Sequence, residues 1–183
     1  MNRKGFTMIE LLAVIVVLGI VLVITFPNMT DVFKSSKLKS EEAFVERISQ
    51  SIDSYVTLNS SNITFDKQPK NFIKCLGLSP QKVEVYKSAI KVEDIINEGI
   101  ITENDYKNPG NENGDCKKET EIEVYRDSDY VYCHKIKEVQ LNGCLSDEYI
   151  KKNEIVDNDE KYIVNTCVWK IEKEDADQCN VSE

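Results

Sequence analysis

One apolar segment near the N-terminus constrains this chain more than any other feature. Residues 6–26 contain a single charged side chain, Glu10, and residues 11–24 are fourteen consecutive apolar or glycine residues. A helix over residues 6–26 would be about 31 Å long, which matches the hydrocarbon thickness of a bilayer. We therefore expect it to cross a membrane. A cleaved secretory signal is the alternative, but no small-x-small cleavage site follows, because residues 25–28 are Thr, Phe, Pro and Asn.

Glu10 is the residue of this segment that most needs a physical explanation. A carboxylate inside a membrane span costs about 2.5 to 3.5 kcal/mol on insertion scales, so a compensating partner is expected. Lys4 is the nearest cation in the sequence. The simplest alternative is that Glu10 lies in the first turns of the helix and extends to the membrane surface.

The residues around Glu10 resemble the N-terminus of type IV pilins and pseudopilins. The shared features are a short basic leader of class III type ending in Gly5, an aromatic Phe6, a glutamate four residues later, an uninterrupted apolar helix and Pro27. The resemblance implies that a prepilin peptidase removes residues 1–5 and methylates the amino group of Phe6. It also implies that this amine pairs with Glu10 of a neighbouring subunit in a filament, where attraction at low dielectric offsets the cost of burial.

After the apolar segment, the chain is expected to continue as an amphipathic helix and then a head. Pro27 lacks a backbone N–H, so it should kink or locally melt the helix. Apolar residues at helical spacing extend to Val56, and the helix is expected to end near Asn59. We expect residues 34–42 to be exposed to solvent or to neighbouring subunits and residues 44–56 to pack under the head. The expected organisation is a cleaved leader (1–5), a transmembrane and polymerisation helix (6–29), its amphipathic continuation (30–59) and an extracytoplasmic head (60–183).

The head is expected to be a small antiparallel sheet. Alternating residues predict strands at 121–124 and 130–136, joined by a turn at 126–129, and a third strand at 162–171 whose core face holds Ile163, Cys167, Trp169 and Ile171. A short helix at 91–101 should end near Gly99 in a left-handed cap. Residues 59–80 are predicted to be loop-rich, and residues 82–88 are a candidate fourth strand. The fold class is thus α+β, a long N-terminal helix, membrane-spanning and then amphipathic, packed on a small sheet, which the resemblance to pilins also implies.

The cysteines are expected to act as disulfide staples. Six of them lie beyond the apolar helix: Cys75, Cys116, Cys133, Cys144, Cys167 and Cys179. With no C-x-x-C pair and His134 as the sole histidine, zinc and thioredoxin-type sites lack their ligand spacing. Outside the cytoplasm, where the resemblance puts the head, each disulfide would stabilise it by about 2 to 4 kcal/mol. The pairing stays open, and free buried thiols or bonds between subunits are the alternative.

Charge and motif content argue against nucleic acid and catalysis. The formal net charge is -9, from 23 Lys and Arg against 32 Asp and Glu, which opposes binding to a phosphate backbone. Cys133 and His134 should point to opposite faces of a strand and so cannot form a nucleophilic pair. Residues 108–115 form a turn cluster, but Pro109 takes the place of the first acidic ligand of an EF-hand. We therefore expect no enzymatic activity, no cofactor and no bound metal.

Three functional hypotheses follow from these features. The first is a structural subunit of a bacterial type IV pilus; six cysteines exceed the one disulfide of many pilins and favour a minor pilin whose head serves adhesion, motility or uptake. The second is a pseudopilin of a type II secretion-like or competence apparatus. The third is a membrane-anchored binding module that never polymerises, but such an anchor needs neither Glu10 nor the junction of Gly5 with Phe6.

The pilin hypothesis also implies partners and a location. The expected partners are other pilin subunits, contacted through the N-terminal helix, and the prepilin peptidase. The chain is expected in the cytoplasmic membrane before assembly and in an extracellular pilus on the cell surface afterwards. A truncated head starting near Thr30 should be a soluble monomer, because the apolar assembly surface lies in residues 6–26.

Overall fold

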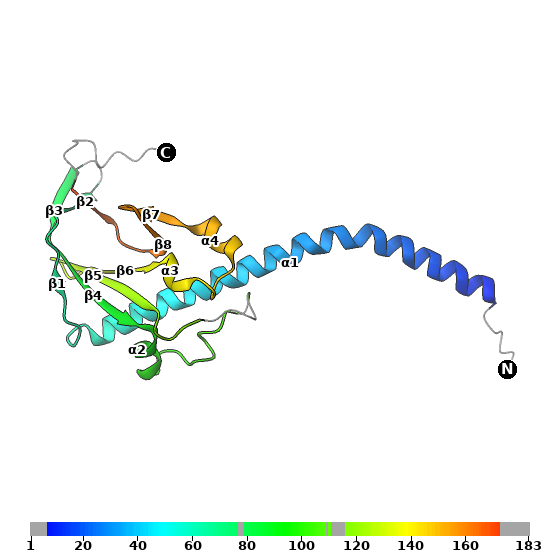
Figure 1. Cartoon of the computed structure of the whole chain (residues 1–183), viewed down its shortest axis with the longest axis horizontal. Coiled ribbons are helices and arrows are strands. Elements are labelled where there is room, and N and C mark those ends of the chain that lie inside the picture. The colour runs from blue at the N-terminus through cyan, green and yellow to red at the C-terminus, as the bar shows by residue number, and fades with distance from the viewer. Residues whose placement is uncertain (1–6, 77–78, 109, 111–115, 173–183) are drawn as a thin grey trace.

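A helix of 52 residues, α1 (Met8–Asn59), runs from the N-terminal end into the head. This computed structural model describes residues 7–76, 79–108, 110 and 116–172. At 1.5 Å per residue, α1 is about 78 Å long. Figure 1 shows its N-terminal half projecting away from a head that is built around its C-terminal half. The helix ends at Asn59, as the amphipathic pattern predicts.

Pro27 lies inside α1 and does not interrupt the helix. Of the two expected outcomes, a kink or local melting, the melting does not occur, and Figure 1 shows a bend along the projecting part of α1. A proline removes one hydrogen bond of the helix but leaves its neighbours, so a helix can bend and continue. Across the residues that the structure describes, no helix is both long enough and apolar enough to cross a membrane.

Within the described residues, the head contains two antiparallel sheets and three short helices. The larger sheet has the strand order β1-β4-β5-β6-β8-β7, and the smaller has the order β3-β2-β9. The larger sheet consists of β1 (Asp66–Lys67), β4 (Val85–Lys91), β5 (Glu121–Asp127), β6 (Tyr132–Lys137), β7 (Ile155–Asp157) and β8 (Glu160–Asn165). The smaller sheet consists of β2 (Phe72–Leu76), β3 (Ser79–Val83) and β9 (Trp169–Ile171), and the helices are α2 (Val92–Asn97), α3 (Glu138–Leu141) and α4 (Asp147–Asn153). The predicted α+β class and the hairpin of β5 and β6 are confirmed, but the turn lies at residues 128–131 and not at 126–129.

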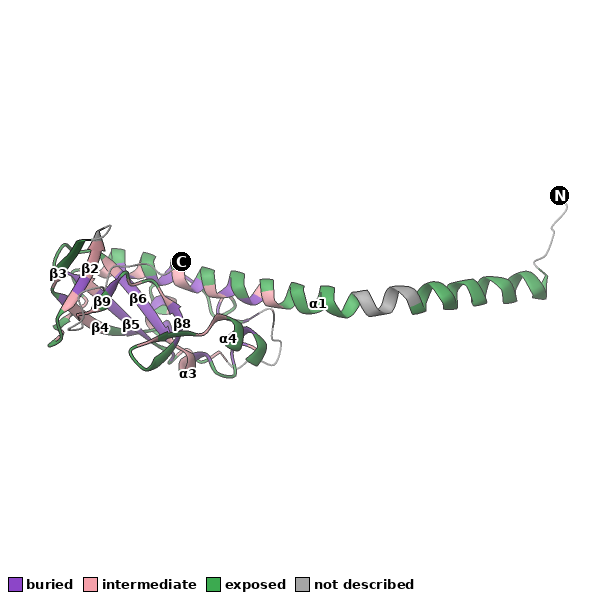
Figure 2. Cartoon of the chain, turned by 90° about the horizontal axis from the view of Figure 1, so that it is seen from above, coloured by how far each residue is buried: buried purple, intermediate pink, exposed green. Residues whose placement is uncertain are grey.

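One face of α1 packs on the larger sheet and forms the main core. Four helix residues spaced four apart are at most 2% exposed: Phe44, Ile48, Ile52 and Val56. They share a cluster with Ile122, Val124 and Ile136 of β5 and β6. Figure 2 shows buried residues along this half of α1 and exposed residues along the projecting half. The prediction that residues 44–56 pack under the head is confirmed.

The opposite face of the larger sheet packs against the smaller sheet. A second buried cluster lies there, formed by Val85, Tyr125, Cys133 and Trp169. Cys133 belongs to this cluster, whereas the His134 side chain contacts Ser49 of α1. The two neighbours therefore point to opposite faces of β6, as the alternation of a strand predicts.

The predicted third strand at 162–171 is wrong as a single element. The chain forms β8 in the larger sheet and β9 in the smaller sheet, with a break at residues 166–168. At the break, Thr166 N donates to His134 O at 3.0 Å and Cys167 N donates to Asn165 Oδ1 at 3.1 Å. Ile163 therefore packs toward α1, whereas Cys167 and Trp169 pack in the second cluster.

Two predictions for the first half of the head also need correction. Residues 59–80, expected to be loop-rich, include β1 and β2, and Cys75 lies in β2. The candidate strand at 82–88 is two strands, because Glu84 separates β3 of the smaller sheet from β4 of the larger one. Pro80 is tolerated in β3 because that strand lies at a sheet edge, where a missing N–H is not costly.

The predicted helix at 91–101 is confirmed as α2, with shorter bounds. Gly99 has a φ of +71°, which is the left-handed conformation expected after a helix. Its N–H donates to Ile96 O at 2.9 Å, and the N–H of Ile100 donates to Ile95 O at 3.2 Å. These bonds satisfy carbonyl groups that the end of the helix would otherwise leave open.

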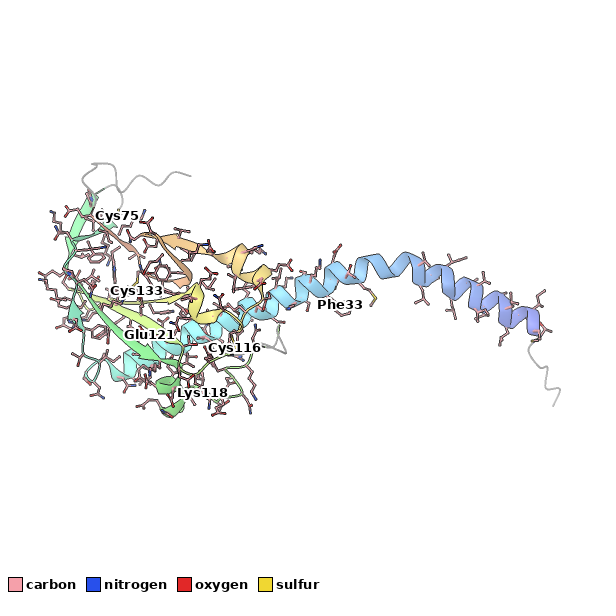
Figure 3. All side chains as sticks on the ribbon, viewed as in Figure 1. Phe33, Cys75, Cys116, Lys118, Glu121 and Cys133 are labelled. Carbon is pink, nitrogen blue, oxygen red and sulfur yellow. A yellow bond between two sulfur atoms is a disulfide. The ribbon has the colours of Figure 1, made fainter. Side chains whose placement is uncertain are left out.

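Disulfides join parts of the head that are distant in the sequence. Cys116–Cys144 links the segment before β5 to the turn between α3 and α4, and Cys133–Cys167 links β6 to the segment between β8 and β9. Cys75 is also disulfide-bonded, and Cys179 lies outside the described residues. Figure 3 places Cys75, Cys116 and Cys133 in separate regions of the head.

Candidate assembly surface

The projecting half of α1 carries an exposed apolar surface. Thirteen large apolar side chains between Met8 and Val23 are each at least 50% exposed. No charged residue stands between Leu11 and Val23. Burying a side chain of this kind contributes about 1.5 to 3 kcal/mol, so a continuous surface of this size indicates a partner or a lipid phase.

A capping box between Thr7 and Glu10 fixes the start of this surface. The N and Oγ1 atoms of Thr7 both donate to Glu10 Oε2, at 2.9 and 2.8 Å, and Glu10 N donates to Thr7 Oγ1 at 3.4 Å. The helix dipole also favours a negative charge in this first turn. The T-x-x-E signature of this capping box can be read from the sequence. Prediction from the sequence explains Glu10 by a charged partner or by extension to the membrane surface and misses this capping role.

The structure describes part of the predicted processing and assembly site. Glu10 is exposed in the first turn of α1, and Pro27 lies in a stretch of the helix whose side chains are not described. Gly5 and Phe6 lie outside the described residues. Cleavage, methylation and the pairing of the Phe6 amine with Glu10 therefore stay predictions.

Gly19 lies within the apolar surface. A Cβ atom added to it would meet no atom within 4 Å, so the fold of the described chain does not require a glycine there. Glycine inside a helix costs about 1 kcal/mol relative to alanine. A small residue on an apolar helix surface allows another helix to approach closely, which is how helices pack where there is no water.

Glu41 anchors the projecting helix to the head. Its side chain is 0% exposed, and its carboxylate accepts hydrogen bonds from Ser146 N at 2.8 Å, Ser146 Oγ at 2.6 Å and Asn108 Nδ2 at 3.1 Å. Asn108 Nδ2 also donates to Cys144 O at 2.8 Å. A Cβ at Gly110 would lie 2.6 Å from Glu41 Cγ, so a glycine lets this loop approach the helix. The carboxylate thus joins two loops of the head to α1.

Glu41 is the buried exception to the prediction that residues 34–42 are exposed, since residues 34–37, 39 and 42 are exposed. Leu38, Glu41 and Phe44 are three residues apart, so Glu41 lies on the apolar stripe of the helix. That position was a signal in the sequence. The partners of Glu41 lie 67 and 105 residues away along the chain, and no local pattern identifies them.

A second polar contact between α1 and the sheet centres on His134. Its side chain is 1% exposed, with Nε2 2.7 Å from Ser49 Oγ and Nδ1 2.9 Å from Asp53 Oδ1, the latter without the alignment of a hydrogen bond. Burial lowers the pKa of His134, and the Asp53 carboxylate opposes this shift in part. The imidazole is therefore neutral at pH 7.

Ser49, His134 and Asp53 follow the order of a hydrolytic triad, but their setting differs. Ser49 lies in the middle of α1, and its hydroxyl contacts an imidazole that is buried between helix and sheet. A general base must reach the proton of its substrate and then the leaving group. We therefore assign these residues to holding α1 on β6. Among the described residues, no group of three or more His, Cys, Asp or Glu side chains is placed to hold a metal ion.

Comparisons with known proteins bear on the assembly surface. Residues 1–26 match the family model described as the prokaryotic N-terminal methylation motif. The chain is 35% identical over 81 residues to the ComG operon protein 3 homolog of Bacillus licheniformis, and the match covers 41% of this chain and 84% of that protein. No solved structure shows a significant match to the chain.

Proposed function

The chain belongs to the family of type IV pilin-like proteins, and from this premise we propose that it is a structural subunit, a minor pilin, of a bacterial type IV pilus. The observation that carries the proposal is the exposed apolar surface of α1. Residues 7–23 are exposed on every side of the helix, although the only charge among them is that of Glu10. Such a surface is stable only when it is covered, and neighbouring copies of the same helix in a filament cover it.

Maturation prepares this surface for assembly. We propose that a prepilin peptidase removes residues 1–5 and methylates Phe6, the residue before the Thr7 cap. The match of residues 1–26 to the methylation motif supports this step. The new amine then lies one residue from Thr7 and four residues from Glu10.

Glu10 has one role before assembly and another within the filament. In the single chain its carboxylate is held by Thr7. In the filament, the Phe6 amine of a neighbouring subunit pairs with it. At 4 Å and an effective dielectric constant of about 20, this attraction is about 4 kcal/mol, which offsets much of the cost of placing the carboxylate and the amine in an apolar environment. The pairing therefore favours one stagger between subunits over disordered association.

The location of the chain follows from the same proposal. Before assembly, the apolar residues lie in the cytoplasmic membrane, and the head lies outside the cytoplasm, where its disulfides persist. After assembly, the head is displayed on an extracellular filament for adhesion, motility or uptake. The chain acts as a structural protein and not as an enzyme.

A pseudopilin of a type II secretion-like or competence apparatus is the second candidate. The similarity to a ComG operon protein favours it. Electron microscopy of cells labelled with antibody to the head separates the two roles. Label along extended surface filaments supports the pilus, whereas label confined to the cell envelope supports the pseudopilin. A membrane-anchored module that never polymerises would give label without any ordered assembly.

Incorporation of variants into filaments tests the role of Glu10. Glu10→Gln keeps the shape of the side chain and removes its charge, so incorporation should fall by at least about tenfold, the equivalent of 1.4 kcal/mol. Thr7→Val removes the cap and keeps the charge, so incorporation should stay close to that of the natural chain. Asp31→Asn is the matched control, because Asp31 is an exposed acid on α1 beyond the apolar surface.

Mass spectrometry of the same cells checks the processing of each variant. Every chain should begin at a methylated Phe6, so that a loss of incorporation cannot be attributed to failed cleavage. Normal incorporation of Glu10→Gln would show that Glu10 has no pairing role. An equal defect in Thr7→Val would assign the effect to capping of the helix. Chains recovered from surface filaments with Met1 intact would refute the pilin proposal itself.

A further inference from the structure

The end of the head farthest from the N-terminus carries aromatic rings grouped around Arg126. The Cζ atom of Arg126 lies 4.5 Å from the ring centre of Tyr130, 4.9 Å from that of Tyr86 and 5.4 Å from that of Phe65. The ring of Tyr132 lies 5.9 Å from that of Phe65. Figure 1 shows β1 and the adjoining ends of β4 and β5 at this end of the molecule. We refer to Arg126 and these four rings as the aromatic cluster.

Strand register builds the aromatic cluster. Lys67, Tyr86, Arg126 and Tyr132 stand directly opposite one another across β1, β4, β5 and β6. Arg126 is two residues after Val124, so the two side chains lie on the same face of the sheet. Near the middle of the sheet, α1 covers this face at Val124. Phe65 comes from the segment after α1, which ends at Asn59. The cluster therefore occupies the helix-side face of the sheet where the helix has ended.

Arg126 has aromatic neighbours but no anionic one. Among the described residues, no carboxylate lies within ion-pair distance of its guanidinium, and its Nε is buried without an acceptor. Eight lysines of the head, by contrast, have carboxylate partners. A planar guanidinium matches the geometry of a carboxylate or phosphate, and three rings hold this one in place. An unpaired arginine in so acidic a chain marks a position for an anion.

Tyr130 is held beside Arg126 in a costly conformation. Its φ is +61° and its side chain is 67% exposed, and such a backbone costs about 1 kcal/mol or more for a residue with a large side chain. Asp127 fixes the loop: it is 1% exposed, and its Oδ1 accepts from Asp129 N at 2.9 Å and Val131 N at 2.8 Å. A buried carboxylate thus maintains a strained turn that presents an exposed ring.

A cavity of about 400 Å³ lies beside the end of β1 and the segment before β4, and none of the five cluster residues lines it. It shares Lys67 and Glu84 with the surroundings of Tyr86, whose hydroxyl donates to Glu84 Oε2 at 2.9 Å. Amide and ammonium groups and the carboxylate of Glu84 line it beside the aromatic ring of Phe72, and the amides include Gln68 and Asn71. Hydrogen-bonding groups around an apolar ring suit a ligand that carries many hydroxyl groups.

We propose that the aromatic cluster and the neighbouring cavity bind an anionic saccharide, a sugar that carries a carboxylate or a phosphate. Arg126 binds the anion, the exposed ring of Tyr130 stacks on the apolar face of the sugar, and the cavity receives its hydroxyl groups. The proposal is independent of the assembly helix, so its failure would leave the role of α1 in assembly untouched.

Saturation-transfer NMR on the full mature chain in detergent micelles tests this proposal. The probes are D-glucuronate and D-glucose 6-phosphate, with D-glucose as the neutral match. We expect binding of at least one charged sugar, at least about tenfold tighter than that of glucose. The two charged probes distinguish a carboxylate from a phosphate as the preferred anion.

Variants assign the binding to the cluster. Arg126→Gln should weaken the charged sugar at least about tenfold, whereas Lys151→Gln, which removes a positive charge on the exposed face of α4, should not. Arg126→Lys keeps the positive charge but loses the planar guanidinium that donates two parallel hydrogen bonds, so it should weaken binding as well. This variant provides the measurement if Arg126→Gln does not fold. Tyr130→Gly relieves the strained backbone and removes the ring, so the chain should keep its melting temperature while binding falls.

Three results would overturn the proposal. One is equal binding of the charged sugar by the natural chain and by both Arg126 variants. Another is binding of glucose as tight as that of the charged sugars. The third is binding of a triglutamate peptide without any binding of the charged sugars, which would make the ligand an acidic peptide.

Discussion

Removal of the buried carboxylate of Glu41 should destabilise the head more than any change to its exposed neighbours. Glu41→Ala deletes an acceptor that serves Ser146 N, Ser146 Oγ and Asn108 Nδ2. The same change leaves a void beneath the loop at Gly110, whose backbone lies against the side chain. Both effects act where the projecting helix enters the head, so the substitution tests the junction between assembly helix and display domain.

The magnitude follows from what each donor loses. Asn108 Nδ2 keeps its bond to Cys144 O, and the Ser146 hydroxyl can rotate, so the backbone N–H of Ser146 is the donor left without a partner. An unsatisfied buried group costs about 1 to 3 kcal/mol, and the lost methylene packing adds about 1 kcal/mol. Relief from burying a charge and the higher helix propensity of alanine offset part of this cost. We expect a net loss of about 2 kcal/mol in the free energy of unfolding.

Urea unfolding of a fragment covering residues 30–183 measures this loss. Trp169, the only tryptophan, is 5% exposed and lies in the second cluster, so its fluorescence reports unfolding of the whole head. With a denaturant slope of about 2 kcal/mol per molar, a loss of about 2 kcal/mol lowers the midpoint by about 1 M. Glu42→Ala is the matched control, because Glu42 is the exposed neighbour on the same helix.

The comparison between the two variants decides the question. Glu42→Ala should stay within about 0.5 kcal/mol of the natural fragment, as exposed substitutions generally do. If Glu41→Ala shifts the midpoint no more than Glu42→Ala, the three hydrogen bonds contribute nothing net and the reasoning about the junction is refuted.

Three further measurements address the head. Burial lowers the pKa of His134 in the folded head, so on acidification the unfolded chain takes up a proton first. The free energy of unfolding should therefore fall as the pH drops below about 6.5, and urea midpoints at two pH values measure this fall. A fall of equal size in the His134→Gln variant would contradict this assignment. Cys116–Cys144 and Cys133–Cys167 span 28 and 34 residues. Their loop-closure entropy is about 3.5 to 4 kcal/mol each, so reduction should lower the melting temperature by more than about 10 °C, and an unchanged melting curve would show that they do not stabilise the head. The fragment from Thr30 should sediment as a monomer, and an oligomer in dilute solution would place a second assembly interface in the head.

Features that depend on neighbours along the chain could be predicted from the sequence. The stripe of Phe44, Ile48, Ile52 and Val56 repeats every four residues, and the structure buries all four. Gly99 follows α2 in the left-handed conformation that glycine adopts readily, and this preference depends on the residue itself and its immediate neighbours. The apolar segment around Glu10 carries its own signature, which the match of residues 1–26 to the methylation motif reproduces. In each case the pattern and its physical cause lie within a few residues of each other.

Features that depend on which strands pair were decided by the tertiary structure. Alternation places residues 162–171 in extended conformation, but it does not show that β8 and β9 join different sheets, since hydrogen bonds to β6 and β2 make that choice. The partners of Glu41 and the row that sets Arg126 between Tyr86 and Tyr132 depend in the same way on register between distant segments. Local periodicity records whether a side chain is buried. The identity of the group that buries it is fixed only when remote parts of the chain meet.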